Sequence, residues 1–444
     1  MENLKNIILA VTDFVCGYPL FFWLIGGGLF LFIYSGAVPL RWIGKSMHSL
    51  RTRAEGEGQI SSFQALMSTI SSTVGMGNIA GVAIALVVGG PGAIFWMWVS
   101  ALLGMATKFF EGTLAIMYKG RDENGEIQGG PMYVLTHGIG PKMKPLAMFF
   151  SVFGMIGCLC VMQANQLVEA LYTVFLTPAG VPETLGIRFV IGLCIAGLVS
   201  IVVLGGINRI SKVATKIVPV MVALYFLIVF TIIILHLNLL PGVFARIFHE
   251  AFSMQAGFGA FAGVAITGAR RAMYVNEAGV GTASIMHGSS RNPEPVREGL
   301  VAMLGPVIDS GFVCTLTAIP IIMADNFEVE GVKGLTVALG AFGKLLPYVG
   351  KYLLMLMVVI FAFSTMFSYS YYGTRCAAYL FGTRNEKYYK IFYILMLVLA
   401  SVLSLDVAVG IMDISFALMS IPTMFSLLYL APRVKKEMKR FAGR

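Results

Sequence analysis

Long apolar runs recur along almost the entire chain and leave it few ways to fold. A helix that crosses the hydrocarbon core of a bilayer needs about 20 mostly apolar residues. Of the 444 residues, 57% are hydrophobic and only 12% are charged. The pattern predicts an all-α polytopic membrane protein with eleven transmembrane helices, at residues 17–40, 60–88, 92–118, 145–176, 184–206, 213–238, 252–269, 297–324, 349–373, 388–405 and 407–431.

The basic residues between these runs predict how the chain is oriented in the plasma (inner) membrane. Lysine and arginine are enriched in cytoplasmic loops. Alternate loops, including 41–58, 270–298 and the C-terminal tail, hold 25 of the 32 Lys and Arg residues, and the opposite side holds 6. We therefore expect the N-terminus outside and the C-terminus in the cytoplasm. The net charge of +10 is explained by basic loops on the cytoplasmic side of the lipid bilayer, and it requires no nucleic-acid partner.

The second run contains the stretch "SSTVGMGNIAGVA" (71–83), with three glycines and Asn78 inside an otherwise apolar segment. Glycine weakens a helix, and a buried amide is costly without partners. Non-helical backbone at membrane depth survives only where protein or a water-filled cavity covers it. The stretch predicts a broken helix that lines a binding site. The alternative is tight helix packing, because small residues let helices approach closely.

The seventh run has a similar glycine cluster, "AGFGAFAGVAITGA" (256–269). It lies five spans after the second run and crosses in the opposite direction. Paired interrupted helices in matching positions indicate an inverted-repeat secondary transporter. We expect a 5+5 inverted repeat within one transmembrane domain, with repeat one at 59–240 and repeat two at 241–432. An extra N-terminal span with its loop (1–58) precedes the repeats, and a basic tail (433–444) follows them.

Several motifs carry a resemblance to a known family. They are "GMGNIAGVAIALVVGGPGAIFWMWVSALLGMATKFFE" (75–111), "GGPMY" (129–133), "QAN" (163–165), "NEAGVGTA" (276–283) and "FAFSTMFSYSYYG" (361–373). In this order they closely resemble the alanine or glycine:cation symporter family, within the amino acid–polyamine–organocation superfamily. The resemblance implies an amino-acid symporter driven by Na⁺, or in some members by H⁺. It also implies the inverted-repeat fold of the neurotransmitter:sodium symporters.

The resemblance also implies a sodium site between the broken second span and the ninth span. Its ligands would be the backbone carbonyls of Ser71, Val74 and Phe361 and the hydroxyls of Ser364 and Thr365. Small hard cations prefer such oxygen ligands. In the alternative interpretation, the two hydroxyls bond only to the preceding turn of their own helix.

The expected substrate contacts come from the resemblance and the repeat geometry together. The amino acid's carboxylate is expected at the broken backbone of Gly75, Gly77 and Asn78, with Gln163 against it. Phe261 would cover the substrate, and Tyr369 would line the part of the pocket that holds the substrate's side chain. The chain departs from the family pattern at Tyr369, where a tryptophan is expected, at Thr374, where a glutamate is expected, and at "YVNEAG" (274–279) in place of "FSNEAG".

Ionisable residues within spans are functional candidates by default. Lys108 and Glu111 are three residues apart on one helix, a spacing that lets them pair in a structural role. Asp309, in the eighth span, is expected either to serve a broken helix or to carry a proton. A third interpretation is a buried carboxyl that neighbouring hydroxyls satisfy.

The leading hypothesis is Na⁺-coupled uptake of a small neutral amino acid such as alanine or glycine, by a monomer. One alternative keeps the fold and changes the cargo to a larger polar amino acid such as glutamine, or the coupling ion to H⁺. A channel or a non-transporting sensor is a second alternative. The sequence shows no catalytic motif and no Cys/His cluster with metal-ligand spacing, so we expect no enzymatic activity and no cofactor besides the coupling ion.

Overall fold

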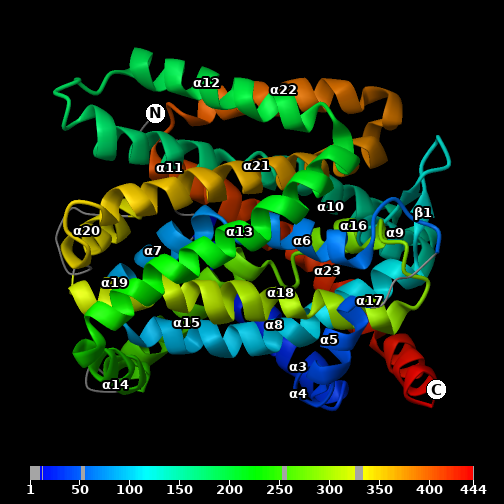
Figure 1. Cartoon of the computed structure of the whole chain (residues 1–444). Coiled ribbons are helices and arrows are strands. Elements are labelled where there is room, and N and C mark those ends of the chain that lie inside the picture. The colour runs from blue at the N-terminus through cyan, green and yellow to red at the C-terminus, as the bar shows by residue number, and fades with distance from the viewer. Residues whose placement is uncertain (1–10, 13, 52–55, 253–257, 326–333, 444) are drawn as a thin grey trace.

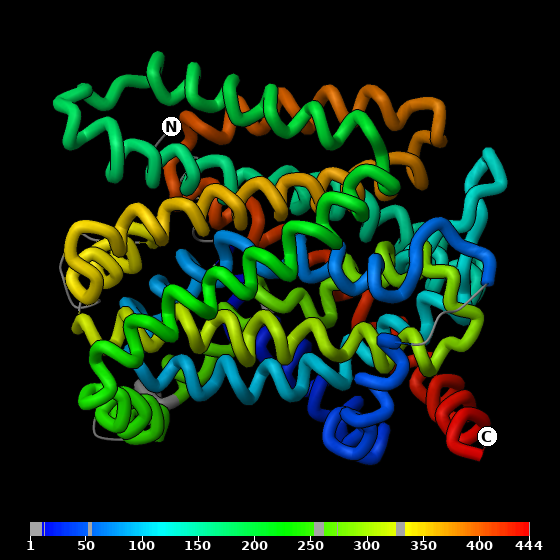
Figure 2. Tube along the Cα trace, in the orientation of Figure 1, coloured from blue at the N-terminus to red at the C-terminus, as the bar shows by residue number. Residues whose placement is uncertain are grey.

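Helices make up most of the described part of the chain, as the apolar runs predict (Figure 1). The computed structural model describes residues 11, 12, 14–51, 56–252, 258–325 and 334–443. The long helices run side by side between two ends of the molecule (Figures 1 and 2). Helices α14 and α20 lie at one end. The β1–β2 hairpin and the C-terminus lie at the other end.

The N-terminal part of the described chain forms short helices with a π-helical turn among them. These are α2 (Tyr18–Phe21), η1 (Phe22–Gly26), α3 (Gly27–Tyr34), α4 (Val38–Arg41) and α5 (Ile43–Arg51).

The next part, up to residue 235, contains the first broken helix and four long apolar segments. Its elements are α6 (Ser62–Thr73), η2 (Gly77–Gly81), α7 (Val82–Gly89), α8 (Gly92–Met117), β1 (Gly120–Arg121), β2 (Ile127–Gln128), α9 (Pro131–Tyr133), η3 (Val134–Ile139), η4 (Pro141–Met143), α10 (Lys144–Gly157), α11 (Val161–Leu171), η5 (Tyr172–Leu176), α12 (Leu185–Val203) and α13 (Gly206–Leu235).

The remaining part contains a second interruption and ends in the longest helix. Its elements are η6 (Leu237–Leu239), α14 (Leu240–Ala251), α15 (Phe258–Asn276), α16 (Thr282–Gly288), α17 (Pro295–Ala302), α18 (Leu304–Pro306), η7 (Val307–Val313), α19 (Cys314–Ala324), α20 (Leu335–Leu345), α21 (Gly350–Phe381), η8 (Thr383–Asn385), α22 (Glu386–Ala400) and α23 (Leu405–Ala442).

Within the described residues, seven helical segments are long and apolar enough to cross a membrane. An eighth is added when α6 and the η2–α7 segment count as one span, bent by 52°. The first and tenth predicted runs contain shorter helices, at Tyr18–Tyr34 and Glu386–Ala400. The chain is therefore a multi-pass helical protein. The count of eleven spans, the 5+5 repeat with its boundaries and the N-outside orientation stay predictions.

The seventh run departs from its predicted form. Helix α15 continues through Gly259, Gly263 and Gly268 to Asn276, so these glycines do not break it. A Cβ on Gly268 would lie 2.4 Å from the carbonyl oxygen of Ala93, so at this position glycine allows close helix packing. The rest of the cluster, at residues 256 and 257, lies outside the described residues. The interruption comes later, at residues 277–281, between α15 and α16.

Two predicted loops are also helical. The segment 270–298, expected as a cytoplasmic loop, contains the end of α15, the buried helix α16 and the start of α17. Arg270 and Arg271, counted among the loop charges, therefore lie within a helix. The basic tail continues α23 as far as Ala442.

Packing brings the two interruptions toward α21. Helices α13 and α21 lie along α6, helices α15 and α17 lie along α8, and α16 contacts both α6 and α21. The π-helical turn η2 contacts α15 and a second π-helical turn, η7. Such turns are frequent at functional sites. The bundle thus places irregular backbone where several helices meet.

Candidate functional site

The first interruption separates α6 from η2 and releases a carbonyl group. Val74 leaves the helical conformation at the end of α6, with φ −78° and ψ 91°. The side-chain oxygen of Asn78 accepts the Gly75 N–H at 2.9 Å. In an unbroken helix this N–H would bond the carbonyl of Ser71, four residues earlier. Asn78 thus stabilises the break and leaves the Ser71 carbonyl without that helical donor.

The second interruption, at residues 277–281, is held by buried carboxylates. Glu277 and Gly279 both have positive φ, of 53° and 85°. The Gly279 N–H donates to a carboxylate oxygen of Glu111 at 2.6 Å. The Glu277 carboxylate accepts hydrogen bonds from the hydroxyls of Thr282 and Tyr369. Side chains from α8 and α21 therefore fix the chain where α15 ends.

A compact group of oxygen atoms lies between α6 and α21. The hydroxyls of Ser364 and Thr365 both donate to the Phe361 carbonyl, at 3.0 and 2.9 Å. The Ser71 hydroxyl donates to the Ser364 carbonyl at 2.9 Å. A Cβ built on Gly75 would lie 2.1 Å from the Thr365 hydroxyl oxygen, so the broken backbone touches α21 directly. The residues predicted for the sodium site are thus neighbours. Their hydroxyls also make the helical back-bonds of the alternative interpretation.

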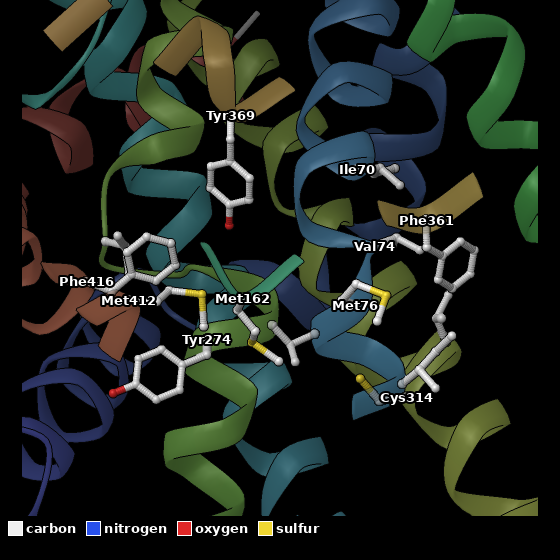
Figure 3. Packing of buried hydrophobic residues seen from close by; sticks show 14 of the residues in the cluster. Ile70, Val74, Met76, Met162, Tyr274, Cys314, Phe361, Tyr369, Met412 and Phe416 are labelled. Atoms are coloured by element: carbon white, nitrogen blue, oxygen red, sulfur yellow. The ribbon is translucent and has the colours of Figure 1, made fainter. Parts of the chain in front are cut away.

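A small cavity adjoins this oxygen group, with a volume of about 20 Å³. That is room for about one water molecule. Figure 3 shows Tyr369, Met162, Met412 and Tyr274 around this region, from four different elements. The cavity is lined by Ser72, Thr73, Gly75, Met76, Gly77, Gly81, Met162, Gln163, Arg271, Tyr274, Val275, Thr365, Tyr369 and Met412.

Four of the six predicted substrate residues line this cavity, namely Gly75, Gly77, Gln163 and Tyr369. Asn78 does not line it. Its side chain is fully buried, and besides holding Gly75 its Nδ2 lies 3.5 Å from the Asp309 carbonyl. In this conformation the Asn78 side chain holds the broken backbone, and its direct contact with the substrate stays a prediction. The side chain of Phe261 lies outside the described residues.

Comparison with known proteins decides the family. A family model described as the sodium:alanine symporter family matches residues 1–444. The chain belongs to the sodium:alanine symporter family. The sodium/alanine symporter AgcS of Methanococcus maripaludis is 37% identical over 448 residues, which cover 98% of this chain and 97% of AgcS. The probable sodium/glutamine symporter GlnT of Bacillus subtilis is 29% identical over 449 residues, covering 99% and 91%.

A solved structure supports the fold independently. The crystal structure of MhsT in complex with L-phenylalanine matches with a TM-score of 0.59 at 12% identity, over 85% of this chain and 98% of MhsT. At this identity the likeness shows the fold alone. Membership of the sodium:alanine symporter family, with AgcS as a relative, indicates a membrane transporter.

Several residues of the cavity are not predicted by the sequence pattern. Arg271 and Tyr274 fall in a predicted loop, although they lie on α15 and face the cavity. Met162 and Met412 resemble ordinary apolar core in the sequence. One signal is present: the glycines at 279 and 281 within "NEAGVGTA" lie where α15 ends and α16 begins.

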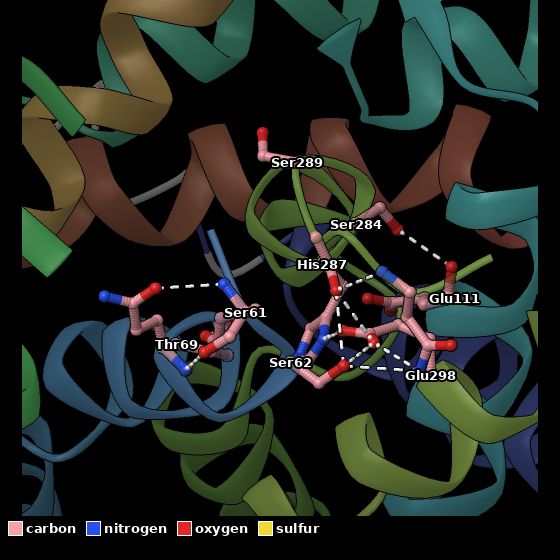
Figure 4. Close-up of polar contacts among 12 residues, drawn as sticks. Ser61, Ser62, Thr69, Glu111, Ser284, His287, Ser289 and Glu298 are labelled. Atoms are coloured by element: carbon pink, nitrogen blue, oxygen red, sulfur yellow. Dashed lines mark hydrogen bonds and ion pairs between the residues drawn. The ribbon is translucent and has the colours of Figure 1, made fainter. Parts of the chain in front are cut away.

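A buried polar network lies farther along the bundle, around α16 (Figure 4). The ring nitrogen Nδ1 of His287 is 2.6 Å from a carboxylate oxygen of Glu298. The second oxygen of Glu298 accepts hydrogen bonds from Ser62 at 2.7 Å, Ser290 at 3.0 Å and Asn292 at 3.2 Å. The network ties the start of α6 to both sides of the α16–α17 connection. In the sequence, His287 falls in a predicted loop and gives no sign of this role.

Lys119 extends this polar region beyond the end of α8. Its ammonium donates to the carbonyls of Ser290 at 2.6 Å and Glu57 at 3.0 Å. Burial lowers the pKa of Lys119 below the usual range of a lysine, and the nearby carboxylates of Glu298 and Glu57 oppose that effect. Lys119 thus joins the start of the second apolar run to the segment after α16.

The ionisable residues singled out within spans are all buried. Lys108 and Glu111 lie 3.8 Å apart, as their spacing predicts. Asp309 lies in η7, and its carboxylate accepts the N–H of Ser310. The backbone carbonyl of Asp309, rather than its carboxylate, faces the amide of Asn78. A role for the Asp309 carboxyl group in proton transfer stays a prediction.

Proposed function

We propose that the chain is a secondary active symporter that takes up a small neutral amino acid, such as alanine or glycine, together with Na⁺. Transport would proceed by alternating access, with the substrate between the break after α6 and the helices α11, α15 and α21. The observation that carries the proposal is the contact between this break and α21, where backbone and hydroxyl oxygens gather next to a small cavity.

The cation part of the proposal rests on the oxygen atoms of α6 and α21. The five proposed ligands are the carbonyls of Ser71, Val74 and Phe361 and the hydroxyls of Ser364 and Thr365. Asn78 supports the site because it takes the Gly75 N–H away from the Ser71 carbonyl. The hydroxyl of Thr365 can donate to Phe361 and still bind a cation through its lone pairs. The relative AgcS, a sodium/alanine symporter by name, also supports Na⁺ as the coupling ion.

The substrate part of the proposal rests on the cavity. Gly75, Gly77 and Gln163 would contact the amino-acid core, and Tyr369 would limit the side chain. The buried Gln163 oxygen has no hydrogen-bond partner among the described residues, so it is available to a substrate ammonium group. A cavity with room for about one water molecule must widen before it can hold even alanine. This conformation is consistent with a closed step of the transport cycle.

A second candidate substrate is a larger polar amino acid such as glutamine. Tyr369 stands where the family resemblance predicts a tryptophan, and a tyrosine leaves more room. GlnT, a 29% identical relative, is by name a probable sodium/glutamine symporter. The same fold and cation site would serve either substrate.

A thermal-shift panel tests both parts of the proposal. The purified protein is heated with each of the twenty amino acids, once in Na⁺ and once in K⁺. We expect a rise in melting temperature with alanine or glycine that requires Na⁺, because a ligand that binds only the native state stabilises it. The same rise in K⁺ would contradict Na⁺ coupling, and a rise in K⁺ that depends on pH would favour H⁺. A rise with glutamine alone would favour the second substrate.

A further inference from the structure

Arg271 is a positively charged residue in a place where charge is expensive. It lies on α15, two residues beyond the seventh predicted apolar run (252–269) and less than two turns before the interruption at 277–281. It is partly buried, and it is the single charged side chain among the cavity-lining residues that the structure describes. Burying a charged side chain is costly unless a partner or water compensates it.

The adjacent arginine shows what such compensation looks like. Arg270 turns toward α23, where its guanidinium lies 3.2 Å from the carboxylate of Asp413. For Arg271, no carboxylate lies within ion-pair distance in the described part of the chain. Its guanidinium carbon lies 5.7 Å from the ring centre of Tyr274, which also borders the cavity. One arginine of the pair is therefore neutralised within the protein, and the other is directed to the cavity.

The remaining polar groups of the cavity complement this charge. The side-chain oxygen of Gln163, an acceptor, has no partner among the described residues. The Gly75 N–H, which could have held an anion, is already bonded to Asn78. A guanidinium presents a fork of N–H donors that matches a carboxylate in two parallel hydrogen bonds. The cavity thus offers a donor fork to an anion and an acceptor to an ammonium group.

We propose that Arg271 binds a carboxylate of the transported amino acid. The inference rests on the proposed function and gives Arg271 a part in the carboxylate binding expected of the broken backbone with Gln163. The carboxylate has two possible sources: the α-carboxylate that every amino acid carries, or the second carboxylate of an acidic amino acid. Both would fit the guanidinium fork, and binding measurements distinguish them.

The test compares wild-type protein with Arg271→Gln, Arg271→Lys and the control Arg209→Gln. Arg209 is exposed, and its guanidinium bonds the Ile201 carbonyl, so the control removes the same charge away from the cavity. Dissociation constants in Na⁺ are measured by calorimetry for L-alanine, L-glutamine, L-glutamate and alaninamide. Alaninamide has no carboxylate. Melting temperature without ligand reports whether each variant folds.

We expect Arg271→Gln to weaken binding by at least about tenfold, because a hydrogen-bonded charge pair is lost. Arg271→Lys should lose less, since it keeps the charge and loses the fork. Losses for alanine, glutamine and glutamate, with no loss for alaninamide, would identify the α-carboxylate as the bound group. A loss for glutamate alone would identify the second carboxylate.

Other results overturn the inference. If the dissociation constants of the Arg271→Gln variant stay within about twofold of wild type for every amino acid, the guanidinium binds no carboxylate. An equal loss in Arg209→Gln would assign the effect to net charge and also contradict it. If Arg271→Gln does not fold, the Arg271→Lys variant provides the test. Unchanged amino-acid binding by Arg271→Lys would contradict the paired hydrogen bonds between the guanidinium and a carboxylate. A folded wild type that binds none of the amino acids instead contradicts the proposed function, and this inference falls with it.

Discussion

Replacing Thr365 by valine removes the hydroxyl proposed as a Na⁺ ligand and keeps nearly the same side-chain shape. In the structure this hydroxyl donates to the Phe361 carbonyl at 2.9 Å, and the Ser364 hydroxyl donates to the same carbonyl at 3.0 Å. Phe361 therefore keeps a donor in the Thr365→Val variant. The main cost should fall on the bound cation rather than on folding.

The expected size of the effect follows from the loss of one polar ligand among about five. A hydrogen bond to a charged group contributes about 1.5–3 kcal/mol, and we take a lost cation ligand to cost a similar amount. Each 1.4 kcal/mol changes an equilibrium constant tenfold, so half-saturation should require about 10- to 100-fold more Na⁺. Thr365→Ser keeps the oxygen and serves as the matched control, with Na⁺ dependence close to wild type.

The assay is a Na⁺ titration of alanine binding, followed by the melting temperature at fixed alanine concentration. Wild type and Thr365→Ser should reach half-saturation at similar Na⁺ concentrations, and Thr365→Val at a much higher one. A Thr365→Val curve that overlays wild type would refute the reasoning. The hydroxyl would then serve only its own helix, and the cation would bind elsewhere.

Three further changes test other parts of the account. Gly75→Ala should abolish transport while the protein still folds, because its Cβ would lie 2.1 Å from the Thr365 hydroxyl oxygen and push α6 from α21; wild-type uptake would contradict this contact. Glu298→Gln should lower the melting temperature, because three hydrogen-bond donors and His287 lose their buried carboxylate partner. The expected loss of stability is about 1–3 kcal/mol. An unchanged melting temperature would contradict a stabilising role for this network. In a Cys194→Ser background, an impermeant thiol reagent added outside cells should label Tyr348→Cys and spare Lys142→Cys, and the reverse pattern would invert the predicted orientation.

The helical segments are well predicted from the sequence because lipid imposes a strict rule on them. Backbone in hydrocarbon must bond internally, so each spanning helix leaves a long apolar run. The boundaries of α8 at Gly92–Met117 fall within a residue of the predicted run, since glycine and proline precede it and polar residues follow it. The break at Gly75 was also predictable, because glycines and an asparagine in mid-span weaken a helix where lipid penalises loose backbone most.

The second interruption could not be placed from hydropathy alone. The true break at 277–281 lies among polar residues, and a membrane loop has the same composition. Its polar groups are satisfied by Glu111 on α8 and Tyr369 on α21, which are distant in sequence. Arg271 was misassigned for the same reason: an arginine that faces a buried cavity cannot be told from a loop arginine until the packing is known.

Accumulation of labelled alanine in proteoliposomes tests the central claim most directly. The purified protein is reconstituted, and an inward Na⁺ gradient is imposed with equal alanine on both sides. Na⁺-coupled symport predicts that alanine rises inside above its outside concentration, and that it returns to equality when the Na⁺ gradient is dissipated. Alanine that never exceeds the outside concentration, or that accumulates equally with K⁺ in place of Na⁺, would contradict the account.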